Sequence, residues 1–210
     1  MGKDTRRIVE YLGSLIEYRD LAEEGHCYHV RKFTEIILKQ VMQYFSEYNL
    51  RKEDWAYISF AAMLHDVGKI QISDKILLKP GRLTESEFEI VKTHTYKGKK
   101  IFEQMKQITE KNSDDYKLFT YCAEVCMYHH ERYDGSGYPE GLKGEEIPIS
   151  AQVVGLADAY DTMLCERIHK AAYSKERAFE MVMAGECGMF SPKLLELFQM
   201  LRQELEEAAE

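Results

Sequence analysis

The sequence predicts an all-α fold. Apolar residues recur at intervals of three and four along most of its 210 residues, which is the spacing of amphipathic helices. Alternating strand patterns are nearly absent, and helix-start signals precede two of the periodic segments. This length suits one domain with a proper hydrophobic core, or one domain with a short extension.

Each expected helix is placed by an apolar stripe or by a start signal. Thr84 followed by Glu87 is a capping box, and it opens a helix that we expect to continue through His94. Ser191 and Pro192 are the cap and the first helical position of the last of these helices. The expected helices cover residues 33–44, 55–64, 85–105, 119–130, 154–161 and 192–198.

Two segments interrupt the helical pattern. Residues 107–117 are polar, and we expect them to loop out. Residues 134–148 hold four of the thirteen glycines and two of the four prolines. That composition predicts an ordered surface loop directly after the fourth helix.

Composition limits the kinds of partner. The formal net charge of −8 argues against a broad binding surface for duplex nucleic acid, although a small basic pocket or bound metals can still attract an anion. The five cysteines include no C-x-x-C pair, which predicts reduced thiols and a cytoplasmic location. The amino terminus lacks the apolar core of a signal peptide, and no apolar run is long enough to insert in a membrane.

His65 and Asp66 are adjacent at the end of an apolar run. Such a pair can supply one nitrogen ligand and one carboxylate that bridges two metals, although a capped helix end with a satisfied histidine would look the same. Lys69, one turn further, could neutralise a phosphate oxygen, yet most single lysines are solvated surface charges. The number of histidine and carboxylate candidates suits a pair of divalent first-row metals better than one closed zinc site.

The doublet His129–His130 is a rarer pattern. Adjacent side chains on a helix point about 100° apart, so both can bind metal only at their shared edge or where the helix ends. Glu131 and the glycine-rich segment that follows predict such an end. His94 lies in the preceding helical stretch.

His26 shares an apolar stripe with core residues, and His29 lies on the neighbouring edge, so the spacing leaves both open as ligands. Asp158 lies in the apolar stretch VVGLADAY. A buried carboxylate needs a partner, and a metal ion is an effective one. Asp161, one turn later, could orient a ligand histidine.

Together these motifs resemble the HD-GYP family, a branch of the HD-domain metal-dependent phosphohydrolases. The matching strings, between about Tyr18 and Phe198, are RDLAEEGHCYHV, HDVGKI, ILLKPGRLTESEFEIVKTH, HHERYDGSGYPEGLKGEEIP and VVGLADAYDTM. The resemblance implies an HD-domain helical bundle with an ordered GYP loop. It also implies a phosphodiesterase that hydrolyses cyclic di-GMP to linear pGpG, with any further cleavage to GMP being slow.

The resemblance further implies two divalent metal ions, iron or manganese. Asp66 bridges them in this reading. One metal is held by Asp66 with His26, His65 and Asp158, and the other by Asp66 with His94, His129 and His130.

The substrate contacts are implied in the same way. Asp66 and Lys69 match the family's catalytic positions. Two groups match residues near the substrate, the basic residues Arg167 and Lys170 and the loop residues Gly137, Tyr138 and Pro139.

The chain departs from the family pattern at several positions. Ala22 stands where a third-metal glutamate is often found, which favours two metals over three; Glu23 and His29 are the nearby alternatives for that ligand. His29 replaces the usual arginine, and Thr95 replaces a common proline after His94. At residues 168–169, Ile-His replaces the common Pro-Tyr, and the stretch between His94 and His129 is longer than usual.

We expect an amphipathic extension over residues 1–18, an HD-GYP catalytic domain over 19–200 and a charged tail over 201–210. Three alternatives to cyclic di-GMP hydrolysis stay open. They are a phosphodiesterase for another cyclic dinucleotide such as cyclic GMP-AMP, a weakly active signalling module, and a helical bundle with incidental histidines. Expected partners beyond the cyclic dinucleotide are a diguanylate cyclase or sensor domain and a second copy of the chain.

Overall fold

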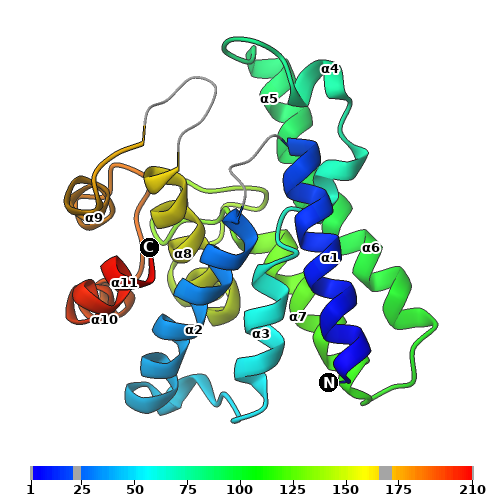
Figure 1. Ribbon diagram of the computed structural model, residues 1–210, viewed down its shortest axis with the longest axis horizontal. Helices are drawn as coiled ribbons and strands as arrows, with labels where there is room; N and C mark the ends of the chain where they lie inside the picture. The colour runs from blue at the N-terminus through cyan, green and yellow to red at the C-terminus, as the bar shows by residue number, and fades with distance from the viewer. Residues whose placement is uncertain (1, 21–24, 166–171, 210) are drawn as a thin grey trace.

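The computed structural model describes residues 2–20, 25–165 and 172–209, and within these ranges it contains helices and loops with no β-strand (Figure 1). The all-α prediction is confirmed. The α-helices are α1 (Lys3–Asp20), α2 (His26–Tyr44), α3 (Asp54–Ala62), α4 (Asp74–Leu77), α5 (Glu85–Lys92), α6 (His94–Gln107), α7 (Asp114–Tyr128), α8 (Ile149–Leu164), α9 (Lys175–Met183), α10 (Pro192–Met200) and α11 (Arg202–Ala208). Short 3₁₀ turns are η1 (Ser46–Tyr48), η2 (Val67–Gln71) and η3 (Gly144–Glu146).

Helices α2 and α8 pack against each other at the centre of the bundle (Figure 1). Phe33 of α2 and Tyr160 of α8 are fully buried, and their ring centroids lie 5.1 Å apart. Helix α3 packs on α2 and α7, while α6 packs along α7. Burial of these apolar faces is the main stabilising contribution to the fold, and it fixes the helix ends that carry the histidines.

The helix expected over residues 85–105 is instead two helices, α5 and α6, that meet at Thr93. The reason is local. The side chains of Thr93, His94 and Thr95 each contact the carbonyl oxygen three residues earlier, at 2.5, 2.7 and 2.9 Å. Such side-chain bonds compete with the backbone ladder of a helix. His94 therefore begins a helix instead of lying within one.

The loop expected at 107–117 is shorter than predicted, because α7 already begins at Asp114. Ser113 caps this helix by accepting a hydrogen bond from the backbone N–H of Tyr116, and the two aspartates of the first turn favour the same start. The loop predicted over residues 134–148 is confirmed, with η3 near its end. Ser191 and Pro192 hold the predicted cap and first helical positions of α10.

Helices α9, α10 and α11 lie on the side of the bundle opposite α6 (Figure 1). The sequence patterns did not predict α9. In α11, Leu205 and Ala208 are buried, and this helix packs against α2.

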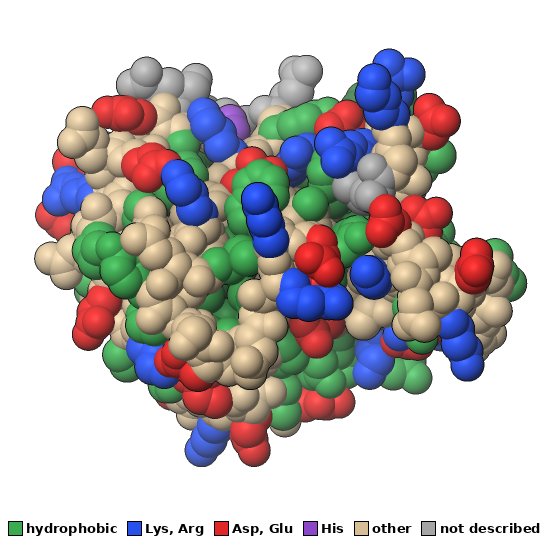
Figure 2. All heavy atoms as spheres, turned by 90° about the horizontal axis from the view of Figure 1, so that it is seen from below, with side chains coloured by type: hydrophobic (Ala, Val, Ile, Leu, Met, Phe, Trp, Pro, Cys, Tyr) green, Lys and Arg blue, Asp and Glu red, His purple; other side chains and the backbone are tan. Residues whose placement is uncertain are grey.

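The surface carries charges of both signs. Acidic, basic and hydrophobic side chains are interspersed over the face seen from below (Figure 2). In the part of the chain that the structure describes, no helix combines the length and the apolar character needed to cross a bilayer.

Candidate metal centre

His65 and Asp66 lie in the turn between α3 and η2. The His65 ring is buried, and its Nδ1 donates a hydrogen bond to the carbonyl oxygen of Ala62 at 2.7 Å. Nε2 is therefore the nitrogen left for a metal ion, and it lies 3.3 Å from Oδ2 of Asp66. Gly68 permits this turn to lie against α6, since a Cβ atom there would overlap the backbone carbonyl of His94.

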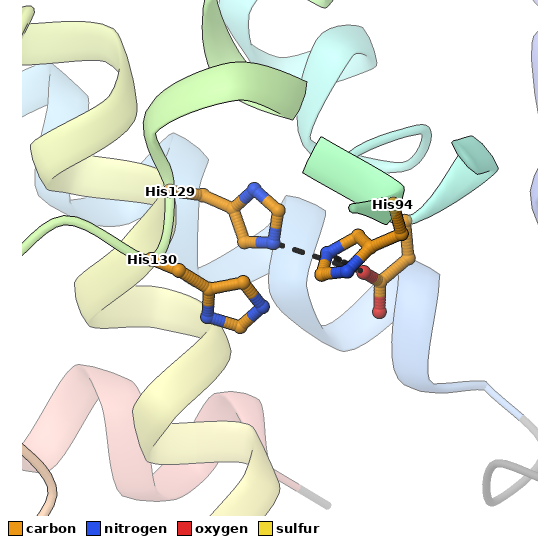
Figure 3. A group of neighbouring side chains, drawn as sticks. His94, His129 and His130 are labelled. Atoms are coloured by element: carbon orange, nitrogen blue, oxygen red, sulfur yellow. Dashed lines mark ion pairs between the residues drawn. The ribbon is translucent and has the colours of Figure 1, made fainter. Parts of the chain in front are cut away.

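His94, His129 and His130 converge from the start of α6 and the end of α7 (Figure 3). His94 Nδ1 contacts the carbonyl oxygen of Val91 at 2.7 Å, and His129 Nδ1 contacts that of Val125 at 2.9 Å. Both rings thereby turn an Nε2 lone pair toward the same space. Because α7 ends at Tyr128, the two adjacent histidines can face one site, with ring centroids 4.0 Å apart.

Asp66 is the centre of this arrangement. Its Oδ1 lies 3.1 Å from Nε2 of His94 and 3.7 Å from Nε2 of His129. Its Oδ2 lies 2.7 Å from the ammonium of Lys69. One carboxylate oxygen thus faces the α6–α7 histidines, while the other faces His65 and Lys69.

The strongest sign of a metal site is a set of buried polar atoms without a hydrogen-bond partner among the described residues. These atoms are Nε2 of His65, His94 and His129 together with Oδ1 of Asp66. Leaving such atoms unpaired costs roughly 1–3 kcal/mol each. A divalent cation would satisfy all four, because a carboxylate oxygen and the Nε2 atom of a neutral histidine each offer it a lone pair. The residues present therefore fit a metal centre, and ligand atoms of Asp66, His94, His129 and His130 lie within 4.8 Å of one another.

A second group lies on the other side of Asp66. His26, His65 and Asp66 also bring ligand atoms within 4.8 Å of one another. Asp158 of α8 extends this group, since its Oδ1 lies 3.5 Å from Nε2 of His26 and 3.7 Å from Nε2 of His65. Two ligand groups that share Asp66 have the layout of a binuclear site.

Asp161 orients His26. Its position one turn after Asp158 predicted that it could orient a ligand histidine. His26 Nδ1 lies 2.5 Å from Oδ2 of Asp161, which leaves Nε2 directed toward Asp158. The other oxygen of Asp161 lies 3.2 Å from Nδ1 of His29. His29 therefore contacts the carboxylate behind the ligands, and none of the described metal-ligand groups includes it.

The electrostatics of the site favour a bound cation. Burial alone would raise the pKa of Asp66, but Lys69 and His65 hold it well below its usual range. Burial would lower the pKa of His65, yet the carboxylates of Asp66 and Asp158 raise it to about 9, so a metal ion that binds Nε2 would displace a proton there. Burial, together with His129 and His94, keeps the pKa of His130 far below its ordinary value. The carboxylates thus stay ionised and attract positive charge, while His130 stays neutral as a ligand must.

Glu131, directly after the histidine doublet, organises the glycine-rich loop. Its buried carboxylate accepts hydrogen bonds from the backbone N–H groups of residues 140, 141 and 142, at 2.8, 3.1 and 3.1 Å. Gly137 lets the loop fold back, since a Cβ atom there would overlap the backbone of residues 130–132. The sequence pattern indicated only that the helix ends at Glu131. A carboxylate directly before a glycine-rich loop was the available signal that Glu131 binds backbone N–H groups of that loop.

The loop carries Tyr138 and Pro139, joined by a cis peptide bond, to the edge of the metal centre. The Tyr138 ring lies 4.6 Å from that of His130 and 6.1 Å from that of Phe88, measured between centroids. The loop and α5 are thereby held together beside the group formed by His94, His129 and His130.

A cavity of about 310 Å³ opens onto the site. Asp66, His130 and Asp158 reach it from the ligand groups, and Lys69 and Arg132 supply positive charge. Arg132 was missed at the sequence level. Its guanidinium also donates hydrogen bonds to the carbonyl oxygens of His129 and Glu131, at 3.1 and 2.8 Å.

The structure therefore brings together all seven residues expected to bind metal, with Lys69 and the GYP loop beside them. Other expectations fall outside the described residues. These concern Arg167 and Lys170, and the departures at Ala22, Glu23, Ile168 and His169.

Comparison with known proteins identifies the family of this chain. The HD-domain family matches residues 19–193, which is well over half of the chain. A Thermotoga maritima protein named cyclic di-GMP phosphodiesterase is 40% identical over 198 residues, covering 94% of this chain and 50% of that protein. The chain therefore belongs to the HD-domain family and, within it, to the HD-GYP branch.

Other relatives differ in the substrate that they are named for. A Vibrio cholerae protein named 3′3′-cGAMP-specific phosphodiesterase 2 is 33% identical over 193 residues, covering 92% of this chain and 34% of that protein. The chain spans half or less of the length of these curated relatives.

Solved structures agree on the fold. An HDG"Y"P protein from Bdellovibrio bacteriovorus superposes with a TM-score of 0.61 at 17% identity, covering 86% of this chain and 51% of that one. A cyclic GMP-AMP specific phosphodiesterase from V. cholerae gives a TM-score of 0.57 at 18% identity, covering 93% of this chain and 48% of that one. At these identities the likeness concerns the fold alone.

Proposed function

We propose that residues 19–200 form a metal-dependent phosphodiesterase that hydrolyses cyclic di-GMP to linear pGpG. The observation that carries this proposal is the convergence of unpaired nitrogens of His65, His94 and His129 on Asp66, beside a cavity lined by Lys69. A centre of this kind suits hydrolysis of a phosphodiester, and the T. maritima relative is named for cyclic di-GMP.

The proposed cofactors are two divalent metal ions, iron or manganese. Histidine-rich sites with carboxylates and open positions suit these metals. When bound, they would acidify water and stabilise negative charge on a phosphoryl oxygen. Asp66 would bridge the two ions, one completed by His26, His65 and Asp158 and the other by His94, His129 and His130.

The protein's own residues have separate tasks in this reaction. Hydrolysis adds one water across a P–O3′ bond, leaving a 5′-phosphate on one nucleotide and a 3′-hydroxyl on the other. The ammonium of Lys69, 2.7 Å from Asp66, is suited to donate a hydrogen bond to a phosphate oxygen or a proton to the leaving 3′-oxygen. Arg132 adds positive charge to the cavity.

The remaining proposed contacts come from the family pattern. Arg167 and Lys170 would bind substrate phosphate. Gly137, Tyr138 and Pro139 would lie beside the substrate, which agrees with the contact between the Tyr138 and His130 rings. The alanine at position 22 favours two metals and a reaction that stops at pGpG.

We further propose that the protein acts in the cytoplasm, alongside diguanylate cyclase or sensor domains. All five cysteines are free thiols, and four of them are buried, as a reducing compartment allows.

A second candidate substrate is cyclic GMP-AMP, which the name of the V. cholerae relative favours. Both substrates offer the same phosphodiester to the metal centre, so the choice rests on contacts to the bases. Turnover of both, measured side by side at matched concentrations, separates the two candidates.

The direct test is hydrolysis by protein purified without oxygen, with and without added Mn²⁺ or Fe²⁺. Formation of pGpG that requires metal and disappears in Asp66→Ala supports the proposal. Asp4→Ala, at an exposed carboxylate of α1, is the matched control and should retain activity. Bound metal with no turnover of either cyclic dinucleotide would contradict the proposal and favour a signalling module.

A further inference from the structure

Helix α1 has two apolar faces. Val9 and Ile16 are buried against the bundle. On the other side of the helix, five large apolar residues are exposed by 39–85% of their surface: Ile8, Tyr11, Leu12, Leu15 and Tyr18. A helix that is apolar on both sides is normally covered on both, and α1 runs along the outside of the bundle (Figure 1).

The bundle side of α1 is firmly attached, so the outer stripe cannot simply turn inward. The backbone N–H of Cys27 donates a hydrogen bond to the buried carboxylate of Glu17. Arg31 of α2 pairs with Glu10 at 3.2 Å. Gly13 permits close packing, since a Cβ atom there would lie 3.3 Å from the carbonyl oxygen of Met63.

The outer stripe has the spacing that packs against another helix. Ile8, Tyr11, Leu15 and Tyr18 follow one another at intervals of three, four and three residues, which are the a and d positions of two heptads. The same stripe on a second molecule would be self-complementary about a two-fold axis.

Charge and area also suit a second copy. Glu10 and Glu17 are engaged with α2 on the bundle side, so no carboxylate of these central turns opposes the approach of an identical stripe. The five exposed side chains offer several hundred Å², on the order of the ~800 Å² that each partner contributes to a standard interface. From these observations we propose that α1 is a self-association helix, whose outer stripe pairs two copies of this chain.

The pairing would also steady the metal centre. Arg19, at the end of α1, donates hydrogen bonds to the carbonyl oxygens of Lys69, Ile70 and Ile72 in and just after η2. It also pairs with Asp74 at 2.9 Å. Helix α1 is therefore tied directly to the segment that follows Asp66.

Sedimentation of the whole chain across micromolar concentrations tests the proposal. We expect a reversible dimer, and we expect Leu15→Glu and Tyr11→Lys each to raise the dissociation constant by ~30-fold or more, the loss typical of a central interface anchor. Met200→Glu, at an exposed apolar residue of α10 on the other side of the bundle from α1 (Figure 1), is the control and should leave the dimer intact.

Circular dichroism melting of each variant shows whether it is folded. Because Tyr11 and Leu15 are exposed, we expect little change in the melting temperature. A monomer throughout the range overturns the proposal, and so does a dimer that both folded α1 variants retain. Because the readout is mass and not hydrolysis, the result is independent of the proposed enzymatic activity.

Discussion

The Nδ1 atom of His26 lies 2.5 Å from Oδ2 of Asp161, one helical turn beyond Asp158 on α8. This contact fixes the ring so that its other nitrogen faces Asp158. Asp161 therefore holds a candidate ligand in place without being needed as a ligand itself. The consequence is that one half of the metal centre can be weakened selectively.

Asp161→Asn should weaken the half of the site that contains His26. Loss of the charge behind a ligand histidine typically lowers metal affinity 10–100-fold. We expect metal analysis after dialysis to find one ion per chain in the variant and two in the wild type. Two tightly held ions in Asp161→Asn would contradict the role given to this contact, and Asp4→Asn is the control.

Gly155→Ala should disturb the half of the metal centre that contains His129. A Cβ atom at position 155 would overlap the carbonyl oxygen of His129, so α8 must move away from the end of α7. Overpacking of this kind costs about 1–3 kcal/mol. The free energy of unfolding and the affinity for Mn²⁺ should both fall. Ala151→Gly, also on α8, should lower stability by about 1 kcal/mol without changing metal affinity; equal losses of affinity in both variants would refute the steric explanation.

Glu131→Gln should loosen the GYP loop. The neutral amide has one oxygen where the carboxylate has two, so its NH₂ group would face a backbone N–H that now donates to Glu131. We expect a loss of about 1–3 kcal/mol in unfolding free energy. Amide hydrogen exchange should become faster at residues 140–142. Unchanged protection there would show that the carboxylate does not organise the loop.

Arg19→Lys should loosen the segment after Asp66 while keeping the positive charge. Lysine lacks the planar fork with which Arg19 reaches several carbonyl oxygens at once. Exchange of the amides in η2 should accelerate, while that of the buried centre of α7 should not change. Equal protection of η2 in both proteins would show that this clamp is dispensable.

Much of the fold and the layout of the site could be predicted, because buried helices leave a regular apolar period in the sequence. His26 shares such a period with the core residues of α2, and Asp158 stands out in the apolar stretch of α8. The histidine doublet likewise indicated the end of α7. These are local signals, and the family pattern joined them into one site.

Other features depend on contacts between distant segments, or on competition within one turn. The helix breaks at Thr93 because three side chains there form hydrogen bonds with backbone carbonyl oxygens. The apolar periodicity of the sequence contains no sign of such bonds. The binding of loop N–H groups by Glu131 requires the folded loop. The outer face of α1 became evident only when burial showed which of its two apolar stripes faces the core.

The measurement that tests the central claim most directly is a metal titration of metal-free protein, following bound Mn²⁺ or Fe²⁺ and cyclic di-GMP hydrolysis in the same samples. Because Asp66 is shared by both ligand groups, we predict that hydrolysis rises with the second ion per chain and stays level beyond two. Full activity with a single ion, or no hydrolysis with two bound, would contradict a binuclear phosphodiesterase centred on Asp66.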